Sequence, residues 1–159
     1  AGGNYAASLY PAKMAKTQGF DQLIWTDAET HEYIEESGTM NVMFIIDNTL
    51  ITAPASGTIL KGITRDSVLT LARDWGMKVE ERKVPVKEIV EAAKNGTLQE
   101  AFGVGTAATI AHIARIGFED EVYDLGPIAE REFSNKVLFE LDRIKTGKVE
   151  DKFNWTLKV

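Results

Sequence analysis

The chain has 159 residues, and its 44% hydrophobic content is enough for one domain with a sizeable core. A net charge of −6, with no basic run longer than two residues, argues against a nucleic-acid surface. The absence of cysteine excludes disulfides, thiolate catalysis and cysteine-based zinc sites, and the two histidines have no second ligand at metal spacing.

The termini and apolar runs set a first expectation about location. No apolar run approaches the roughly 18 residues of a membrane span, and the start of the chain has no signal-peptide pattern. We therefore expect a cytoplasmic protein, and we interpret Ala1 as a cut end because no initiator Met precedes it.

The first predicted element is a helix from Asn4, its candidate cap, to about Gln18, ended by Gly19. Pro11 lies inside this range and lacks an amide donor, so we expect either a kink or a helix that begins near Pro11. Four short strands follow, at residues 22–25, 32–35, 42–46 and 50–52.

The second half is predicted to mix helices and strands. We first expect a helix at 64–75, with Thr64 as its cap and Gly76 as its stop, and then a strand at 77–83. The next helix has Pro85 in its first turn and ends at 95–96. A strand at 98–102 and a helix at about 127–145 complete the predicted elements. Residues 109–116 are compatible with a helix or a strand. This order lacks the regular alternation of a doubly wound sheet, so the predicted fold is mixed α+β.

An acidic stretch, Glu35-Glu36-Ser37-Gly38-Thr39-Met40-Asn41, precedes the apolar run 42–46. A carboxylate at the end of a strand, followed by a glycine turn, is aimed at whatever lies beyond the strand and needs a cationic partner. The alternative is an exposed acidic turn in which Asn41 bonds only to its own backbone.

A glycine-rich segment, Gly103-Val104-Gly105-Thr106-Ala107-Ala108, fits the pattern G-x-G-x-x-A, and Asp124 follows about 20 residues later. This pattern is typical of dinucleotide binding, but the preceding strand is short and the unit lies late in the chain. The alternatives are a phosphate or carboxylate nest and a purely structural turn. No lysine follows the glycines, which excludes a P-loop.

Four segments in order carry a resemblance to a known family: Gly2-Gly3-Asn4-Tyr5, the acidic stretch, Ile59-Leu60-Lys61-Gly62-Ile63-Thr64-Arg65 and Phe102 to Ala108. Together they resemble the branched-chain amino-acid aminotransferases of the class IV pyridoxal-phosphate enzymes. The resemblance implies the larger, carboxy-terminal domain, a mixed pseudo-barrel β-sheet flanked by helices, with the amino-terminal domain missing. It also implies pyridoxal phosphate as cofactor, amino acid and 2-oxo acid substrates, and a homodimer when intact.

The resemblance implies a role for each matching residue. Tyr5 would bond the cofactor's phenolic oxygen, Glu36 would bond its pyridine nitrogen, and Leu60 would pack on the ring, with Asn41 nearby. The phosphate would be bound by Ile63, Thr64, Gly105 and Thr106. The substrate would be bound by Ala107 and Thr39. Lys61 and Arg65 are instead expected to be solvated at the helix start. The catalytic lysine of the family would stand immediately before Ala1, so we expect the 159-residue chain alone to be inactive.

Two other functions remain open. One is another class IV activity, either D-amino-acid aminotransferase or aminodeoxychorismate lyase, which the acidic stretch fits less well. The second is a non-catalytic domain that binds a phosphate-containing ligand.

Overall fold

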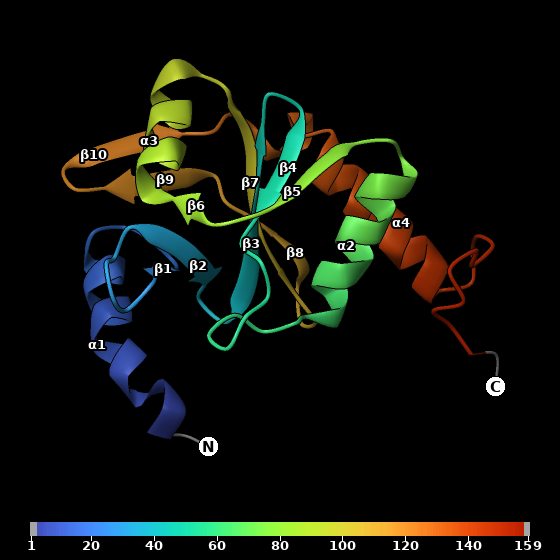
Figure 1. Ribbon diagram of the computed structural model, residues 1–159, viewed down its shortest axis with the longest axis horizontal. Coiled ribbons are helices and arrows are strands. Elements are labelled where there is room, and N and C mark those ends of the chain that lie inside the picture. The colour runs from blue at the N-terminus through green and yellow to red at the C-terminus, as the bar shows by residue number, and fades with distance from the viewer. Residues whose placement is uncertain (1–2, 158–159) are drawn as a thin grey trace.

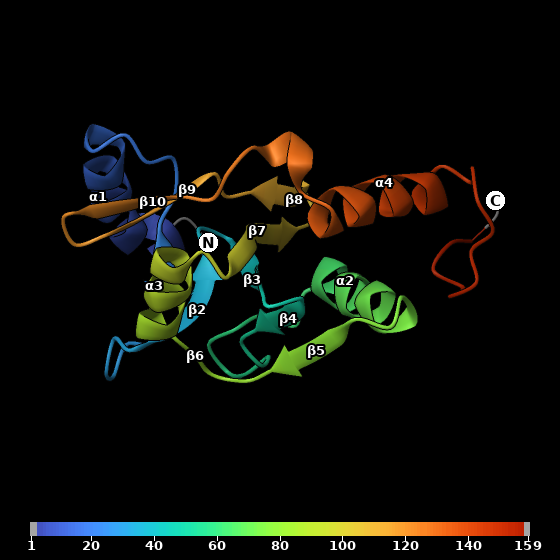
Figure 2. The same ribbon diagram turned by 90° about the horizontal axis from the view of Figure 1, so that it is seen from above.

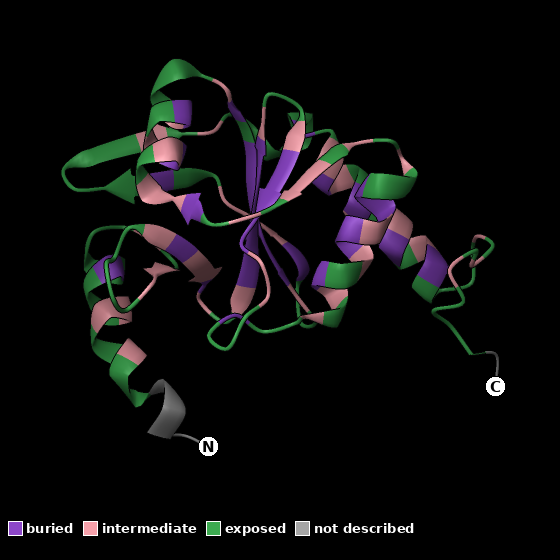
Figure 3. Ribbon diagram, viewed as in Figure 1, coloured by how far each residue is buried: buried purple, intermediate pink, exposed green. Residues whose placement is uncertain are grey.

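The central strand of the fold is β3 (Met40–Ile46), in a computed structural model that describes residues 3–157 and their side chains from residue 6 onward. β7 (Leu98–Gly105) runs antiparallel along one edge of β3. The other edge pairs with β2 (Tyr33–Ser37) near its start and with β4 (Thr49–Thr52) farther along. Figure 3 shows these mostly buried strands crossing at the centre of the molecule.

The remaining strands extend this sheet to eight. They are β1 (Ile24–Thr26) and β6 (Val84–Pro85), which pair with β2, β5 (Lys78–Glu81), which pairs with β4, and β8 (Thr109–His112), which pairs with β7. β4 and β5 are parallel, and a helix forms the crossover connection that parallel strands need, whereas the other described pairs are antiparallel. A separate hairpin consists of β9 (Arg115–Phe118) and β10 (Glu121–Asp124).

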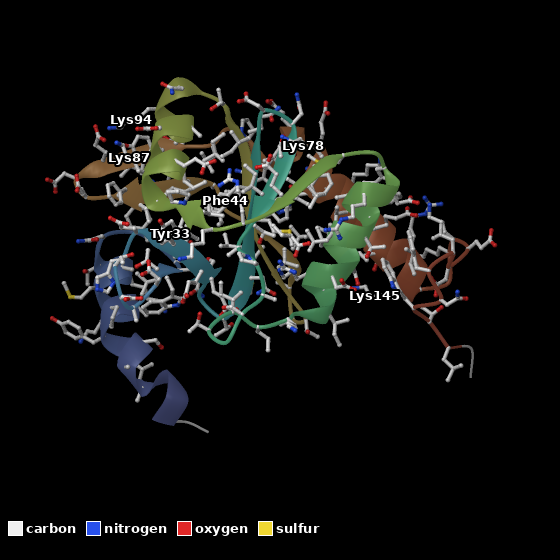
Figure 4. The ribbon with its side chains drawn as sticks, viewed as in Figure 1. Tyr33, Phe44, Lys78, Lys87, Lys94 and Lys145 are labelled. Atoms are coloured by element: carbon white, nitrogen blue, oxygen red, sulfur yellow. The ribbon has the colours of Figure 1, made fainter. Side chains whose placement is uncertain are left out.

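Helices cover both faces of the sheet. The side chains of a strand alternate between its faces, so β3 contributes apolar side chains to a core on each face. Met43 and Ile45 of β3 share a core with α2 (Ile63–Asp74) and α4 (Phe133–Lys145). Phe44 belongs to a second core with α3 (Val86–Asn95). Figures 1 and 2 show α2 and α4 together at one end of the molecule and α3 toward the other, and Figure 4 places Phe44 among the strands, inside the outer layer of labelled lysines. The mixed α+β prediction is confirmed.

The first predicted helix is confirmed in its range, since α1 spans Gly3–Thr17, although Asn4 lies inside it and the alternative start near Pro11 is wrong. Two other predicted helix starts are wrong. Gly62, and not Thr64, is the N-cap residue of α2. α4 begins later than residue 127, since Pro127 instead precedes a short 3-10 helix at Ile128–Glu130.

The segment from 109 to 124 contains three strands and no helix. Residues 109–112 form β8, so the helical alternative for 109–116 is wrong, and the hairpin of β9 and β10 was not predicted. Within residues 3–157, no helix is long and apolar enough to cross a membrane.

Candidate functional site

A cavity of about 320 Å³ opens where the start of β3, the loop before α2 and the turn between β7 and β8 meet. Figure 1 shows these three segments at the same end of the central strands. The lining residues are Glu36, Gly38, Thr39, Asn41, Leu60, Gly62, Ile63, Thr64, Arg65, Val104, Gly105 and Thr106. The cavity therefore gathers every expected site residue whose side chain the structure describes, except Ala107.

Glu36 is fixed at one side of this cavity by strand pairing and by two hydrogen bonds. It lies opposite Asn41 in the pairing of β2 with β3. Its Oε1 accepts hydrogen bonds from Asn41 Nδ2 at 3.2 Å and from the Leu60 amide at 3.1 Å. Among the described residues, none donates to Oε2. Glu36 thus presents one carboxylate oxygen that is available to a donor in the cavity.

The alternative of an exposed acidic turn is contradicted at Asn41. Only 5% of Asn41 is exposed, and its amide bonds to Glu36 and to the Leu60 carbonyl, not to its own backbone. The neighbouring Glu35 accepts a separate hydrogen bond from Thr58 Oγ1 at 2.7 Å.

The start of α2 supplies hydrogen-bond donors to the same cavity. The first amides of a helix have no partner within the helix, and at the N-cap residue Gly62 no side-chain hydrogen bond caps the start of α2. Ile63 and Thr64 line the cavity, so their amides and the positive end of the helix dipole lie at its wall. Thr106 adds a hydroxyl from the turn between β7 and β8. Such an arrangement is typical of an anion site.

The glycine-rich segment has a different structure from the one that its pattern indicates. Gly103 and Gly105 lie within β7, the turn comprises only residues 106–108, and the antiparallel strand β8 follows. A dinucleotide fingerprint requires a helix and then a parallel strand at this point, so that interpretation is wrong. Asp124 lies in the separate β9–β10 hairpin.

The glycines of β7 make room for Met40 on the adjacent strand. A Cβ at Gly103 would lie 2.8 Å from Met40 Cε, and one at Gly105 would lie 3.0 Å from Met40 Cγ. Real Cβ atoms essentially never approach as closely as the contact at Gly103, and the contact at Gly105 is tighter than nine in ten real ones, so the Met40 side chain would have to shift. These glycines therefore serve the packing of β3 against β7, beside the cavity.

Arg65 differs from the expectation of a solvated residue. Only 6% of it is exposed, and its guanidinium donates to the Ala53 carbonyl at 2.9 Å and to Glu81 at 2.8 Å. Burial alone raises the pKa of Glu81, but hydrogen bonds from Arg65 and Arg73 outweigh this effect and lower the pKa below its usual value. Arg65 thus ties α2 to β5, whereas Lys61 is exposed as expected.

One expected site residue, Tyr5, has a side chain that lies outside the described residues, and one described site residue stands apart from the cavity. Ala107 lies exposed in the turn beside Thr106 but does not line the cavity. Leu60 and Ile63 do line it, and they are 73% and 85% exposed at its rim.

Four residues line the cavity but were not expected there as site residues: Gly38, Gly62, Arg65 and Val104. Gly62 stands directly before Ile63 in one of the quoted segments, which was the available signal. Val104 comes to the cavity because it pairs with Asn41 across β3 and β7, and this register is not visible in the sequence.

A larger cavity, of about 510 Å³, contains none of the expected site residues. It lies near the hairpin of β3 and β4 and the start of α4, with Trp75, Phe133 and Lys136 in its wall. Its buried carboxylate, Glu100, already accepts the amides of Phe133 and Ser134 at the start of α4. The smaller cavity is therefore the better candidate site.

Comparison with known proteins identifies similar sequences and structures. Residues 2–116 match the family model described as amino-transferase class IV. The chain is 41% identical over 157 residues to branched-chain-amino-acid aminotransferase 2 of Bacillus subtilis, covering 99% of this chain and 43% of the relative. It thus spans less than half the length of that relative.

Solved structures give the same result for the fold. A mutant branched-chain amino acid aminotransferase from Thermobaculum terrenum superposes with a TM-score of 0.80 and 29% identity, covering 98% of this chain and 48% of that one. The branched-chain amino acid aminotransferase from Escherichia coli gives a TM-score of 0.77 and 28% identity, covering 97% and 48%.

Proposed function

Because the chain belongs to the class IV aminotransferase family, we propose that it is the larger, cofactor-binding domain of a pyridoxal-phosphate-dependent transaminase. The reaction of the full-length protein is the transfer of an amino group between leucine, isoleucine or valine and 2-oxoglutarate. One observation carries this proposal. A single cavity holds, at one side, a carboxylate oxygen to which none of the described residues donates and, at another, Thr106 and the start of α2, which has no side-chain cap.

The residues of the cavity fit the two polar ends of pyridoxal phosphate. The free Oε2 of Glu36 is a suitable acceptor for a protonated pyridine nitrogen, and it remains available because Oε1 takes both hydrogen bonds from the protein. The amides of Ile63 and Thr64 and the hydroxyl of Thr106 suit a phosphate dianion. The exposed Leu60 side chain offers an apolar surface for the ring.

When bound, the cofactor supplies a sink for the electrons that are released when the substrate Cα–H bond breaks. Glu36 would keep the proton on the pyridine nitrogen, and this proton would make the ring a stronger electron acceptor. By the family resemblance, Tyr5 would donate to the phenolic oxygen, the Ala107 amide would receive the substrate carboxylate, and Thr39 would lie beside the substrate. A lysine immediately before Ala1 would hold the cofactor covalently and move the substrate proton.

The test is a transamination assay of the full-length protein with pyridoxal phosphate and 2-oxoglutarate. Leucine, isoleucine and valine should each yield glutamate. The 159-residue chain alone should be inactive, because loss of a general acid-base group costs roughly 10²–10⁴-fold. Leucine turnover by the short chain near the full-length rate would disprove this assignment of the lysine.

The same assay separates the alternatives. Turnover of D-alanine but not of L-leucine would favour a D-amino-acid aminotransferase, and release of pyruvate from aminodeoxychorismate would favour the lyase. A full-length protein that binds the cofactor but converts none of these substrates would be a non-catalytic binding domain, and the proposal would be wrong.

A further inference from the structure

The buried carboxamide of Asn41 connects three segments of the candidate site. Its Nδ2 donates to Glu36 Oε1 on β2 at 3.2 Å and to the Leu60 carbonyl before α2 at 2.9 Å. The Leu60 amide in turn donates to the same Glu36 oxygen at 3.1 Å. These three hydrogen bonds form a closed network in which both amide hydrogens of Asn41 have acceptors.

Gly62 provides the space for this carboxamide. A Cβ at Gly62 would lie 2.4 Å from Asn41 Oδ1, which is too close for any side chain. The backbone of Gly62 has φ −66° and ψ 134°, which every residue adopts, so glycine is not needed there for its conformational freedom. The need for glycine at position 62 comes from Asn41.

The two hydrogen bonds of Asn41 act on opposite ends of the site. The first occupies Oε1 of Glu36, so that Oε2 is the oxygen left for a donor in the cavity. The second holds the carbonyl of Leu60, two residues before Gly62 caps α2, and so fixes the loop that delivers the first amides of the helix. A single side chain therefore determines both the orientation of the carboxylate and the position of the helix start.

We propose that Asn41, in the space left by Gly62, is a positioning residue that couples the pyridine-nitrogen end of the cofactor site to its phosphate end. This inference rests on the proposed function, because it assigns those two ends to pyridoxal phosphate. Asn41 itself acts through Glu36 and the Leu60–Gly62 loop.

The most informative variant is Asn41→Asp, which keeps the shape of the side chain but removes both donors. An ionised aspartate would face two acceptors, Glu36 Oε1 and the Leu60 carbonyl, and would repel both. Gly62→Ala tests the same network from the other side, because its new methyl group displaces Asn41 Oδ1. Thr58→Ala is the matched control, since it removes the hydrogen bond of the adjacent Glu35 and leaves Glu36 untouched.

The experiment uses the full-length protein loaded with pyridoxal phosphate that carries ¹⁵N at the ring nitrogen. The ¹⁵N chemical shift reports protonation of the ring. Titrations of the protein with the cofactor and with inorganic phosphate report its affinity for each of these two ligands. In Asn41→Asp and Gly62→Ala, the shift should move toward that of the unprotonated ring. Both affinities should fall about 10- to 100-fold, which corresponds to the loss of one hydrogen bond to a charged group.

Further measurements make the outcome decisive. Thr106→Val should weaken phosphate binding without moving the ¹⁵N shift, and Thr58→Ala should change neither. The inference is overturned if folded Asn41→Asp or Gly62→Ala protein changes only one end of the site, or neither. If Asn41→Asp does not fold, the result for Gly62→Ala alone decides whether the inference stands. A wild-type protein that does not bind the cofactor, or binds it with an unprotonated ring, would instead disprove the proposed function.

Discussion

At the scale of single residues, Glu36 is distinguished by the unequal use of its two oxygens. We expect Glu36→Gln in the full-length protein to lower kcat by roughly 10²–10⁴-fold while the fold and most of the cofactor affinity remain. The glutamine can still accept the hydrogen bonds of Asn41 and Leu60 through its carbonyl, but its amide group cannot accept a pyridinium proton.

Steady-state kinetics and a cofactor titration measure both parts of this prediction. Glu35→Gln is the control, because it makes the same chemical change at the adjacent residue, whose carboxylate bonds Thr58 instead. An unchanged kcat in Glu36→Gln would mean that this carboxylate has no part in the chemistry.

Thr106 is the only residue of the β7–β8 turn that lines the cavity, and we expect its hydroxyl to contact the phosphate. Thr106→Val keeps the shape of the side chain and removes this hydrogen bond, so the Kd for pyridoxal phosphate should rise about tenfold or somewhat more. Fluorescence titration measures the change. Thr49→Val, at the far end of β3 and β4, should leave the Kd unaltered.

The sequence predicted those residues of the cavity that belong to recognisable segments, and it missed features that depend on distant partners. Glu36 and Thr106 could be identified from their segments alone. The burial of Arg65 could not, because it depends on Ala53 and Glu81, which reach it only after β4 and β5 have paired.

At the scale of elements, the start of α4 is set by a carboxylate on another strand. Glu100 of β7 accepts the amide of Phe133 at 2.8 Å and that of Ser134 at 2.9 Å, and only 5% of Glu100 is exposed. We expect Glu100→Gln to lower the free energy of unfolding by about 1–2 kcal/mol, because it removes one acceptor and the charge that favours a helix start.

Urea denaturation of the 159-residue chain tests this prediction. Glu130→Gln is the matched control, since Glu130 lies exposed just before α4, and its change should cost less than about 0.5 kcal/mol. Equal effects of the two substitutions would show that net charge, and not capping, is responsible.

The same element explains which predictions of secondary structure were right. α2 and α3 end where expected because local signals are sufficient: Gly96 follows α3 in the left-handed conformation, with φ 74°. The start of α4 depends on Glu100, far away in the chain, so local patterns placed it too early. The extent of β7 was missed because its glycines are needed for Met40 and not for a turn.

At the scale of the whole molecule, His112 makes stability depend on pH. Burial, followed by the positive charge of Arg131, lowers the pKa of His112 below its usual value near 6.5, and its Nε2 is buried without a hydrogen bond. The unfolded chain therefore binds this proton more readily than the folded one. The contribution of His112 to the free energy of unfolding is therefore fully present above about pH 6.5, and it decreases as the pH falls below that value.

We expect the free energy of unfolding to decrease between pH 7.5 and 5.5 in the wild type and to decrease less in His112→Gln. Urea titrations at both pH values measure the difference. His31→Asn is the control, because His31 is exposed in a turn with φ 58°, which asparagine tolerates. A pH dependence of His112→Gln equal to that of the wild type would contradict this account.

The candidate site is built from strands that pair over long separations in the chain, and this has a consequence for folding. Asn41 faces Val104 only after β7 has joined β3, and the cavity does not exist before that pairing. Unfolded chains therefore cannot bind a phosphate-containing ligand at this site. By mass action, a ligand at 100 times its Kd would stabilise the native chain by about 2.7 kcal/mol. Supply of the ligand would thus set how long the protein survives proteolysis, independently of any reaction it performs.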